Sequence, residues 1–117
     1  VKYIYLSVPL FSPSVVFEIV FSEKVMSRQL MPDHTHLYTE SSIKYFCEEF
    51  GFKSIAEWWF GTDMVDLFRS VWVTLIKSNN DNVIQPWNDM FRFILDDIQL
   101  SMDKNKMSSE VHMLLKK

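Results

Sequence analysis

Two histidines, His34 and His36, are the side chains of this chain best suited to chemistry. They stand two residues apart in a polar stretch, and in an extended backbone two such residues point to the same side. Two imidazoles on one side could share a metal ion, but such a site needs further ligands. The remaining histidine, His112, lies in a later segment whose pattern predicts a strand. The pattern leaves open a metal site and a structural role in which the imidazoles hydrogen-bond to loop carbonyls, and we predict no metal.

The segment that follows the histidines predicts a helix, a glycine stop and a strand. Thr39 can cap the helix, because its hydroxyl can accept a hydrogen bond from a backbone N–H of the first turn. Gly51 suits the left-handed residue that ends a helix. Cys47 lies on the apolar helix face, so we interpret it as a small core residue rather than a nucleophile. The side chains of that face recur at helical spacing, and they are Ile43, Phe46, Cys47 and Phe50.

The remaining apolar patterns predict two further strands and three further helices. The apolar run 3–8, ended by Pro9, predicts a strand buried on both faces. Ser12 and Pro13 predict the start of a helix that is apolar nearly all round, so we expect it to be covered. In chain order we predict strand 3–8, helix 13–21, an irregular segment 22–33, helix 40–50, strand 52–60, a helix capped by Thr62 that ends before Ser78, a helix from Pro86 to Met102, a loop 103–109 and strand 111–115.

Length and composition favour a single α/β domain, residues 1–117, in the cytoplasm. The 117 residues are 48% hydrophobic, which is enough to form a core. A formal charge of −3 without a basic stripe indicates no nucleic-acid partner. The single cysteine cannot form an internal disulfide, which favours a reducing compartment. The longest uncharged run, 3–17, is too short to span a membrane, so we expect no stable membrane insertion.

Several runs of the chain resemble the late part of class I S-adenosylmethionine-dependent methyltransferases. Pro32–Ile43 (PDHTHLYTESSI) resembles that family's helix start, and Glu48–Phe52 (EEFGF) resembles the helix end that follows it. Tyr3–Pro9 is similar to the family's fifth strand, and Glu110–Lys117 to its closing strand. The resemblance implies a partial Rossmann-like sheet of about three strands flanked by helices. It also implies that the closing strand lies antiparallel between the first and second strands of this chain.

The resemblance further implies where a small-molecule acceptor would bind. In such methyltransferases the loops after the fourth and fifth strands border the acceptor pocket, at the sheet edge where open α/β sheets bind ligands. The residues that it places at this edge are Pro9, Phe11 and Tyr38 as acceptor-binding residues and His36 and His34 as catalytic residues. A histidine there could take a proton from an acceptor hydroxyl or amine, because histidine titrates near neutral pH.

The cofactor half of the family is missing from this sequence. Gly51 and Gly61 are the only glycines, so no G-x-G motif occurs, and no acidic ribose-binding residue is found. The chain starts with Val1 at the beginning of a predicted strand, so we expect a piece of a longer protein. The resemblance then implies that S-adenosylmethionine is bound mainly by the missing half, and that this piece alone is inactive.

Two other functions are compatible with the sequence. One is a self-contained α/β interaction module whose apolar helix, Val15–Phe21, docks a partner. The other is a small metal enzyme built on the histidines. For the isolated chain we also predict a homo-oligomer that forms through the exposed edge of the first strand, because the unpaired N–H and C=O groups of a strand edge can pair with another chain. Adjacent Trp58 and Trp59 we interpret as packing residues first and interface residues second.

Overall fold

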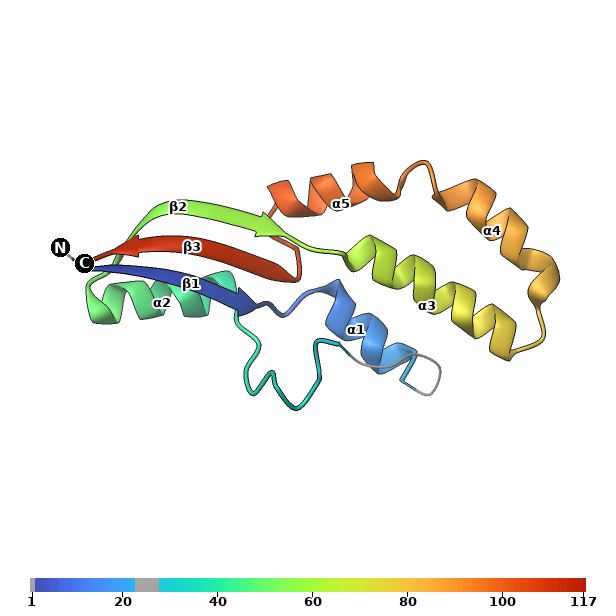
Figure 1. The fold of residues 1–117 in the computed structure, drawn as a ribbon, viewed down its shortest axis with the longest axis horizontal. Helices are drawn as coiled ribbons and strands as arrows, with labels where there is room; N and C mark the ends of the chain where they lie inside the picture. Colours follow the sequence, from blue (N-terminus) through green and yellow to red (C-terminus); the bar gives the residue numbers. More distant parts are fainter. Residues whose placement is uncertain (1, 23–27) are drawn as a thin grey trace.

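A computed structural model describes residues 2–22 and 28–117. Residues 23–27 of the predicted irregular segment lie outside the described residues. Figure 1 shows a small sheet at one end and a group of helices at the other. The elements are strands β1 (Tyr3–Pro9), β2 (Lys53–Phe60) and β3 (Glu110–Lys116), helices α1 (Pro13–Val20), α2 (Glu40–Phe50), α3 (Asp63–Lys77), α4 (Ile84–Phe91) and α5 (Leu95–Lys104), and a 3-10 helix η1 (Asp81–Val83).

The sheet has the order β1-β3-β2, and β3 is antiparallel to both of its neighbours. β1 and β2 therefore run in the same direction without touching. In the described ranges, three antiparallel-paired strands and five α-helices make an α/β fold, as predicted. The last strand of the chain, β3, lies in the middle of the sheet, as the resemblance implied. Hydrophobic periodicity alone does not specify the order of strands in a sheet.

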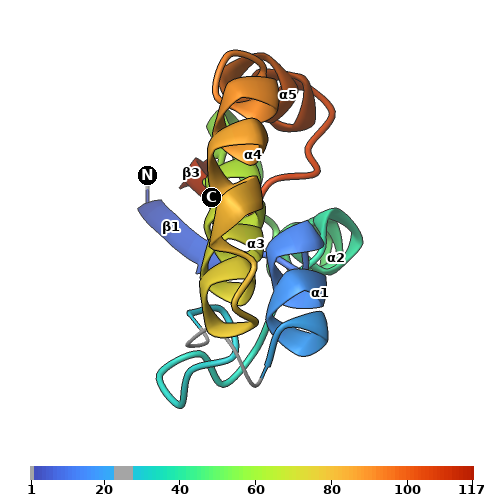
Figure 2. The ribbon, with the colours of Figure 1, turned by 90° about the vertical axis from the view of Figure 1, so that its right-hand side faces the viewer.

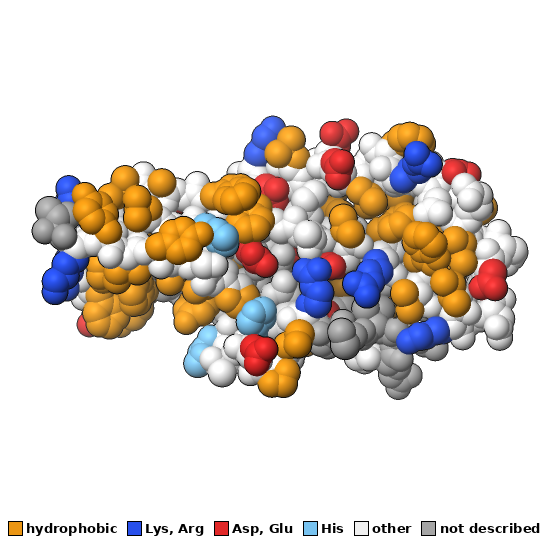
Figure 3. Space-filling view, viewed as in Figure 1, with side chains coloured by type: hydrophobic (Ala, Val, Ile, Leu, Met, Phe, Trp, Pro, Cys, Tyr) orange, Lys and Arg blue, Asp and Glu red, His pale blue; other side chains and the backbone are white. Residues whose placement is uncertain are grey.

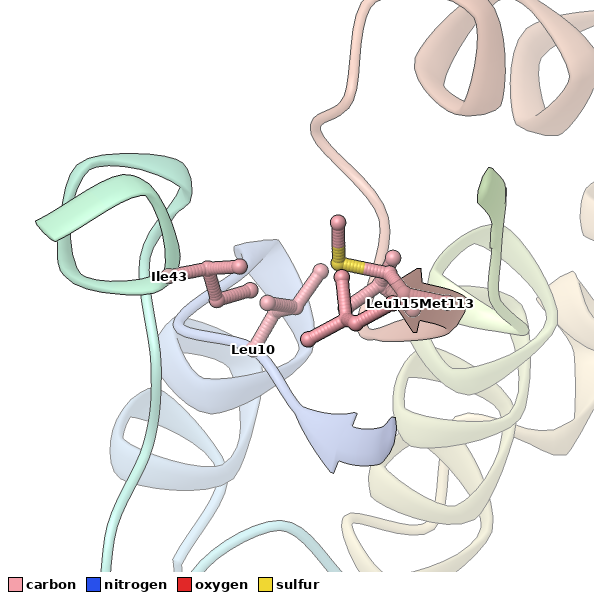
Figure 4. Packing of buried hydrophobic residues seen from close by; sticks show 5 residues of the cluster. Leu10, Ile43, Met113 and Leu115 are labelled. Atoms are coloured by element: carbon pink, nitrogen blue, oxygen red, sulfur yellow. The ribbon is translucent and has the colours of Figure 1, made fainter. Parts of the chain in front are cut away.

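Helix α2 covers one face of the sheet and begins and ends at the predicted residues. Thr39 Oγ1 accepts a hydrogen bond from Ser42 N (3.1 Å), and Ser42 Oγ accepts one from Thr39 N (2.9 Å). Gly51 ends the helix with a left-handed φ of 70°. Figure 4 shows the core beneath this helix, where side chains of α2 and β3 meet the residue that follows β1. The buried residues of this core are Leu10, Ile43, Val111, Met113 and Leu115.

The opposite face of the sheet is exposed, so the prediction that the first strand is buried on both faces is wrong. Tyr3 is 58% exposed and Tyr5 is 65% exposed. On β2, Trp58 is 63% exposed. The apolar run correctly predicts a strand, but burial of its second face needs a partner, and none of the residues that the structure describes lies there.

Helices α1, α3, α4 and α5 form an arm that extends away from the sheet. The molecule measures 59 × 30 × 17 Å. Its radius of gyration of 17.1 Å exceeds the roughly 13 Å of a compact chain of this length. Figure 2, viewed along the long axis, shows α1 and α3 side by side, and these helices are in contact. The predicted cover of α1 is partial, because Ile19 and Val20 on its outer side are 60% and 68% exposed.

The single helix predicted from Pro86 to Met102 is wrong, because the chain forms two helices there. Helix α4 begins at Ile84, two residues before the proline, which is tolerated because the first turn of a helix has N–H groups without intrahelical partners. Trp87 Nε1 of α4 donates to Phe68 O on α3 (3.2 Å). The break after α4 lets α5 return to the start of α3, where Gln99 Oε1 accepts from Met64 N (3.0 Å).

Candidate functional site

Three of the predicted site residues meet at the end of β1. Tyr38 N donates to Pro9 O (3.0 Å), and Phe11 N donates to Tyr38 O (2.8 Å). Leu10 and Tyr38 form a parallel bridge, so the histidine loop runs beside the last residues of β1. The backbone thus brings Pro9, Phe11 and Tyr38 together at the carboxyl edge of the sheet.

His34 shares a shallow cavity with the end of β1. The cavity has a volume of about 160 Å³. His34 Nδ1 lies 3.1 Å from Gln29 O, and His34 N donates to Met31 O (3.0 Å). This imidazole therefore makes the loop-carbonyl contact that a structural role requires, and it also reaches a surface that could hold a ligand. The residues that line the cavity are Ser7, Val8, Pro9, His34 and Glu110.

His36 and Phe11 lie apart from that cavity. The exposed His36 has its Nδ1 3.0 Å from Thr35 Oγ1, and its ring centroid is 6.5 Å from that of Tyr38. Phe11 lines a different cavity of about 420 Å³, together with side chains of α1, Lys106 and Met107. The predicted acceptor-binding residues thus share a backbone junction but not one pocket.

Glu18 on α1 fixes the start of the histidine loop. Its carboxylate accepts hydrogen bonds from three successive backbone N–H groups, those of Arg28 (2.7 Å), Gln29 (2.7 Å) and Leu30 (2.9 Å). Because the loop is also held at Tyr38, both ends of the described part, 28–38, are anchored.

A second anchor ties the same loop to α3. Arg28 Nη1 lies 3.3 Å from Asp66 Oδ1, and Arg28 Nη2 donates to Thr62 Oγ1 (2.9 Å). Burial raises the pKa of Asp66, and the neighbouring guanidinium offsets part of this shift. Thr62 stands at the N-cap position of α3 as predicted, but its hydroxyl bonds to Arg28 and Asp66 rather than to the helix backbone.

Asp63 is a buried carboxylate that the sequence analysis missed. Its side chain is fully buried at the start of α3. Oδ1 accepts from Ser12 Oγ (2.8 Å), Ser14 N (3.1 Å) and Ser14 Oγ (2.7 Å), and Oδ2 accepts from Ser109 N (3.0 Å). This one side chain therefore joins the exit of β1, the start of α3 and the entry to β3. In the sequence it resembles an ordinary acid in a first helical turn.

His112 belongs to a second cluster that the sequence analysis did not assign. Tyr5 Oη lies 2.6 Å from His112 Nδ1, and Glu110 Oε2 lies 4.0 Å from His112 Nε2. The rings of Trp58 and Phe60 meet the imidazole edge to face, at centroid distances of 5.8 and 4.8 Å. The spacing of Glu110 and His112 in a strand was the available signal, because residues at i and i+2 share a face.

A cleft between α2 and β2 is polar at its rim. Lys106 Nζ lies 2.8 Å from Glu40 Oε1, 3.4 Å from Glu57 Oε2 and 4.9 Å from the ring centroid of Trp59. The pKa of Glu57 is lowered, chiefly by the hydrogen bond from Trp59 Nε1 (2.9 Å). Burial is the main cause that raises the pKa of Cys47, which disfavours a nucleophilic thiolate there.

Comparisons with models of protein families, with curated proteins and with solved structures found no match to this chain. Within residues 2–22 and 28–117, no three His, Cys, Asp or Glu side chains are grouped so that they could hold a metal ion. None of the helices in the same described ranges is long and apolar enough to cross a membrane.

Proposed function

We propose that this chain is the acceptor-side and closing-strand portion of a cytoplasmic S-adenosylmethionine-dependent methyltransferase that acts on a small molecule. The observation that supports this most is the place of β3, which lies antiparallel between two strands that run in one direction. The resemblance of the sequence implies this arrangement, whereas sequential hairpins would give a different strand order. The Rossmann-like assignment and the missing cofactor half are part of the proposal.

In this proposal the acceptor binds at the carboxyl edge of β1. Pro9, Phe11 and Tyr38 contact it, and His34 or His36 takes its proton if methylation requires one. Methyl transfer is an in-line displacement, so much of the catalysis is positioning of the acceptor. The hydrogen bonds that hold the histidine loop at Glu18 and at Tyr38 would keep the loop in a fixed position for this purpose. S-adenosylmethionine is held mainly by a part of the enzyme outside this sequence.

This chain alone is expected not to bind S-adenosylmethionine. It lacks the glycine-rich turn and the acidic residue that hold the cofactor in the family it resembles. Titration calorimetry with the chain should give no heat of binding, whereas a longer polypeptide from the same gene that carries a G-x-G turn should bind. Micromolar binding of S-adenosylmethionine to the present chain contradicts the prediction that the cofactor is held by another part of the enzyme. A gene without a G-x-G segment upstream of Val1 contradicts the proposed function itself.

In that longer polypeptide, His36→Ala is expected to lower kcat by about 10²-fold, the usual contribution of a general base. Stability should change by less than about 0.5 kcal/mol, because the side chain is exposed. His34→Ala tests the other candidate base, and Glu48→Ala on the exposed side of α2 is the control. Steady-state kinetics and thermal unfolding separate the two effects. Wild-type turnover in both histidine variants means that neither imidazole is the base.

The interaction module remains the second candidate, supported by the exposed apolar side chains of α1, of which Ile19 and Val20 are the most exposed. The proposed homo-oligomer also belongs here. Among the residues that the structure describes, β1 pairs along its length only with β3, and the bridge between Leu10 and Tyr38 covers only the end of its other edge. A second copy could therefore use either this edge or the sheet face beside it.

A further inference from the structure

The exposed sheet face consists of the side chains that point away from α2. Their alternation along each strand and the strand register define the set. Contiguous apolar surface of this kind marks interaction sites, whereas scattered apolar side chains do not. Figure 3 shows hydrophobic side chains gathered over the three strands. The face comprises Tyr3, Tyr5, Ser7 and Pro9 of β1, Glu110, His112, Leu114 and Lys116 of β3, and Lys53, Ala56, Trp58 and Phe60 of β2.

This face carries a projection and a hollow next to each other. Trp58 stacks on Phe60, with ring centroids 4.3 Å apart, and stands 63% exposed. The next residue of β2 on this face is Ala56, whose small side chain leaves the other side of Trp58 open. A groove of about 260 Å³ results, and its lining includes Tyr5, Ala56, Trp58, His112 and Leu114.

The two ends of the face carry opposite charges. Lys53 and Lys116 are register partners at one end of the sheet. Glu110 is the register partner of Phe60 and Pro9 at the other end. A surface that is basic at one end, apolar in the middle and acidic at the other is complementary to a copy of itself turned end to end.

We propose that the exposed sheet face binds a second copy of this chain about a two-fold axis that runs along the row Leu6–Met113–Glu57, perpendicular to the strands. These three residues are mutual register partners at the middle of the strands. The axis lies between the two sheets and reverses the strand direction, so it exchanges residues that are equally far from the row. Trp58 then lies over Ala56 of the second copy, and Glu110 lies opposite Lys116 of the second copy. The same two-fold rotation therefore places the projection over the hollow and the acidic end opposite the basic end. The interface is isologous, because both copies use the same surface.

The chain exposes more surface than a compact molecule of its mass. The chain exposes 7874 Å², whereas a compact monomer of 14.0 kDa exposes about 6,700 Å². This excess follows from the elongated shape of the whole molecule, which measures 59 × 30 × 17 Å. Pairing through the free edge of β1 would leave Trp58 and the groove exposed, because β2 lies on the far side of β3. The two modes of association therefore respond to different substitutions.

Sedimentation equilibrium of the full chain at tens of micromolar tests the proposal, with a dimer of twice 14.0 kDa expected. Trp58→Ala removes the projection and Ala56→Leu fills the hollow, and each should weaken the dimer about ten-fold or more. Tyr45→Ala is the matched control, because this tyrosine of α2 is 67% exposed on the other side of the sheet. Circular dichroism of each variant verifies that it is folded. A monomeric wild type, or a dimer indifferent to both sheet substitutions, overturns the proposal.

A charge exchange tests the register of the interface. Glu110→Lys and Lys116→Glu should each weaken the dimer, because each places like charges opposite each other across the interface. The double variant restores both opposite-charge pairs and should recover most of the lost affinity. Failure of the double variant to recover overturns the proposed axis, and recovery supports it independently of the aromatic substitutions.

Discussion

Replacing Asp63 by alanine is expected to lower the free energy of unfolding by about 3–5 kcal/mol, because buried donors lose their acceptor at about 1–3 kcal/mol each. The carboxylate accepts hydrogen bonds from Ser14 N (3.1 Å) and Ser109 N (3.0 Å), and backbone N–H groups cannot turn toward another acceptor. The hydroxyls of Ser12 and Ser14 also lose their partner. The three chain segments that meet at Asp63 would lose their common contact together.

Urea unfolding followed by tryptophan fluorescence measures this effect, and the midpoint should fall without a change in the m-value. Asp63→Asn keeps the shape but presents an NH₂ group to donors, so it should also destabilise, though by less. Asp96→Ala, on the exposed side of α5, is the matched control and should stay within about 0.5 kcal/mol of wild type. If Asp63→Ala stays equally close to wild type, the serines hold these segments together without the carboxylate.

The elements that the sequence predicts best are those whose signals are local. Thr39 and Gly51 fix the ends of α2 through contacts within a few residues of themselves, and both behave as predicted. The prediction of one helix from Pro86 to Met102 was wrong because the break between α4 and α5 depends on packing against α3. No local sequence pattern contains that packing. Asp63 was missed for the same reason, since its acceptor role depends on residues 46–51 positions away in the chain.

The candidate site was predictable only in part. The resemblance places Pro9 and Tyr38 at one sheet edge, and the structure shows their backbones in contact there, while their role in acceptor binding stays a prediction. The side-chain directions at that edge are set by loop geometry, which sends Phe11 to one cavity and His34 to another. Sequence spacing cannot specify such directions outside a regular strand or helix. The exposed sheet face was unforeseen because an apolar strand has the same pattern whether its second face is covered or not.

The two glycines of this chain are expected to respond differently to alanine, and Gly61→Ala is expected to have the larger effect. A Cβ at Gly61 would lie 2.5 Å from Asp63 Oδ2, 2.5 Å from Ser109 Oγ and 2.8 Å from Ser109 N. The serine hydroxyl can rotate away, but the carboxylate and the backbone N–H are held by each other. Overpacking and a lengthened hydrogen bond together should cost about 3 kcal/mol.

At Gly51, glycine is favoured by the backbone conformation rather than by a lack of room for a side chain. Nothing lies within 4 Å of a Cβ built there, and φ is +70°. Gly51→Ala should therefore cost only about 1 kcal/mol, the usual penalty of a left-handed alanine. Gly51→Asn should cost less, because asparagine tolerates this conformation.

Thermal unfolding of all variants at one protein concentration separates these cases. With about 4 °C per kcal/mol, Gly61→Ala should lower Tm by about 12 °C and Gly51→Ala by about 4 °C. Combining Gly61→Ala with Asp63→Ala should cost clearly less than the sum of the two, because both act on one cluster and the alanine at 63 removes the atom that the new methyl group meets. Gly51→Ala should add to Asp63→Ala without such coupling. Equal losses at the two glycines, or strict additivity at residues 61 and 63, would mean that the Asp63 cluster is packed loosely enough to absorb a methyl group.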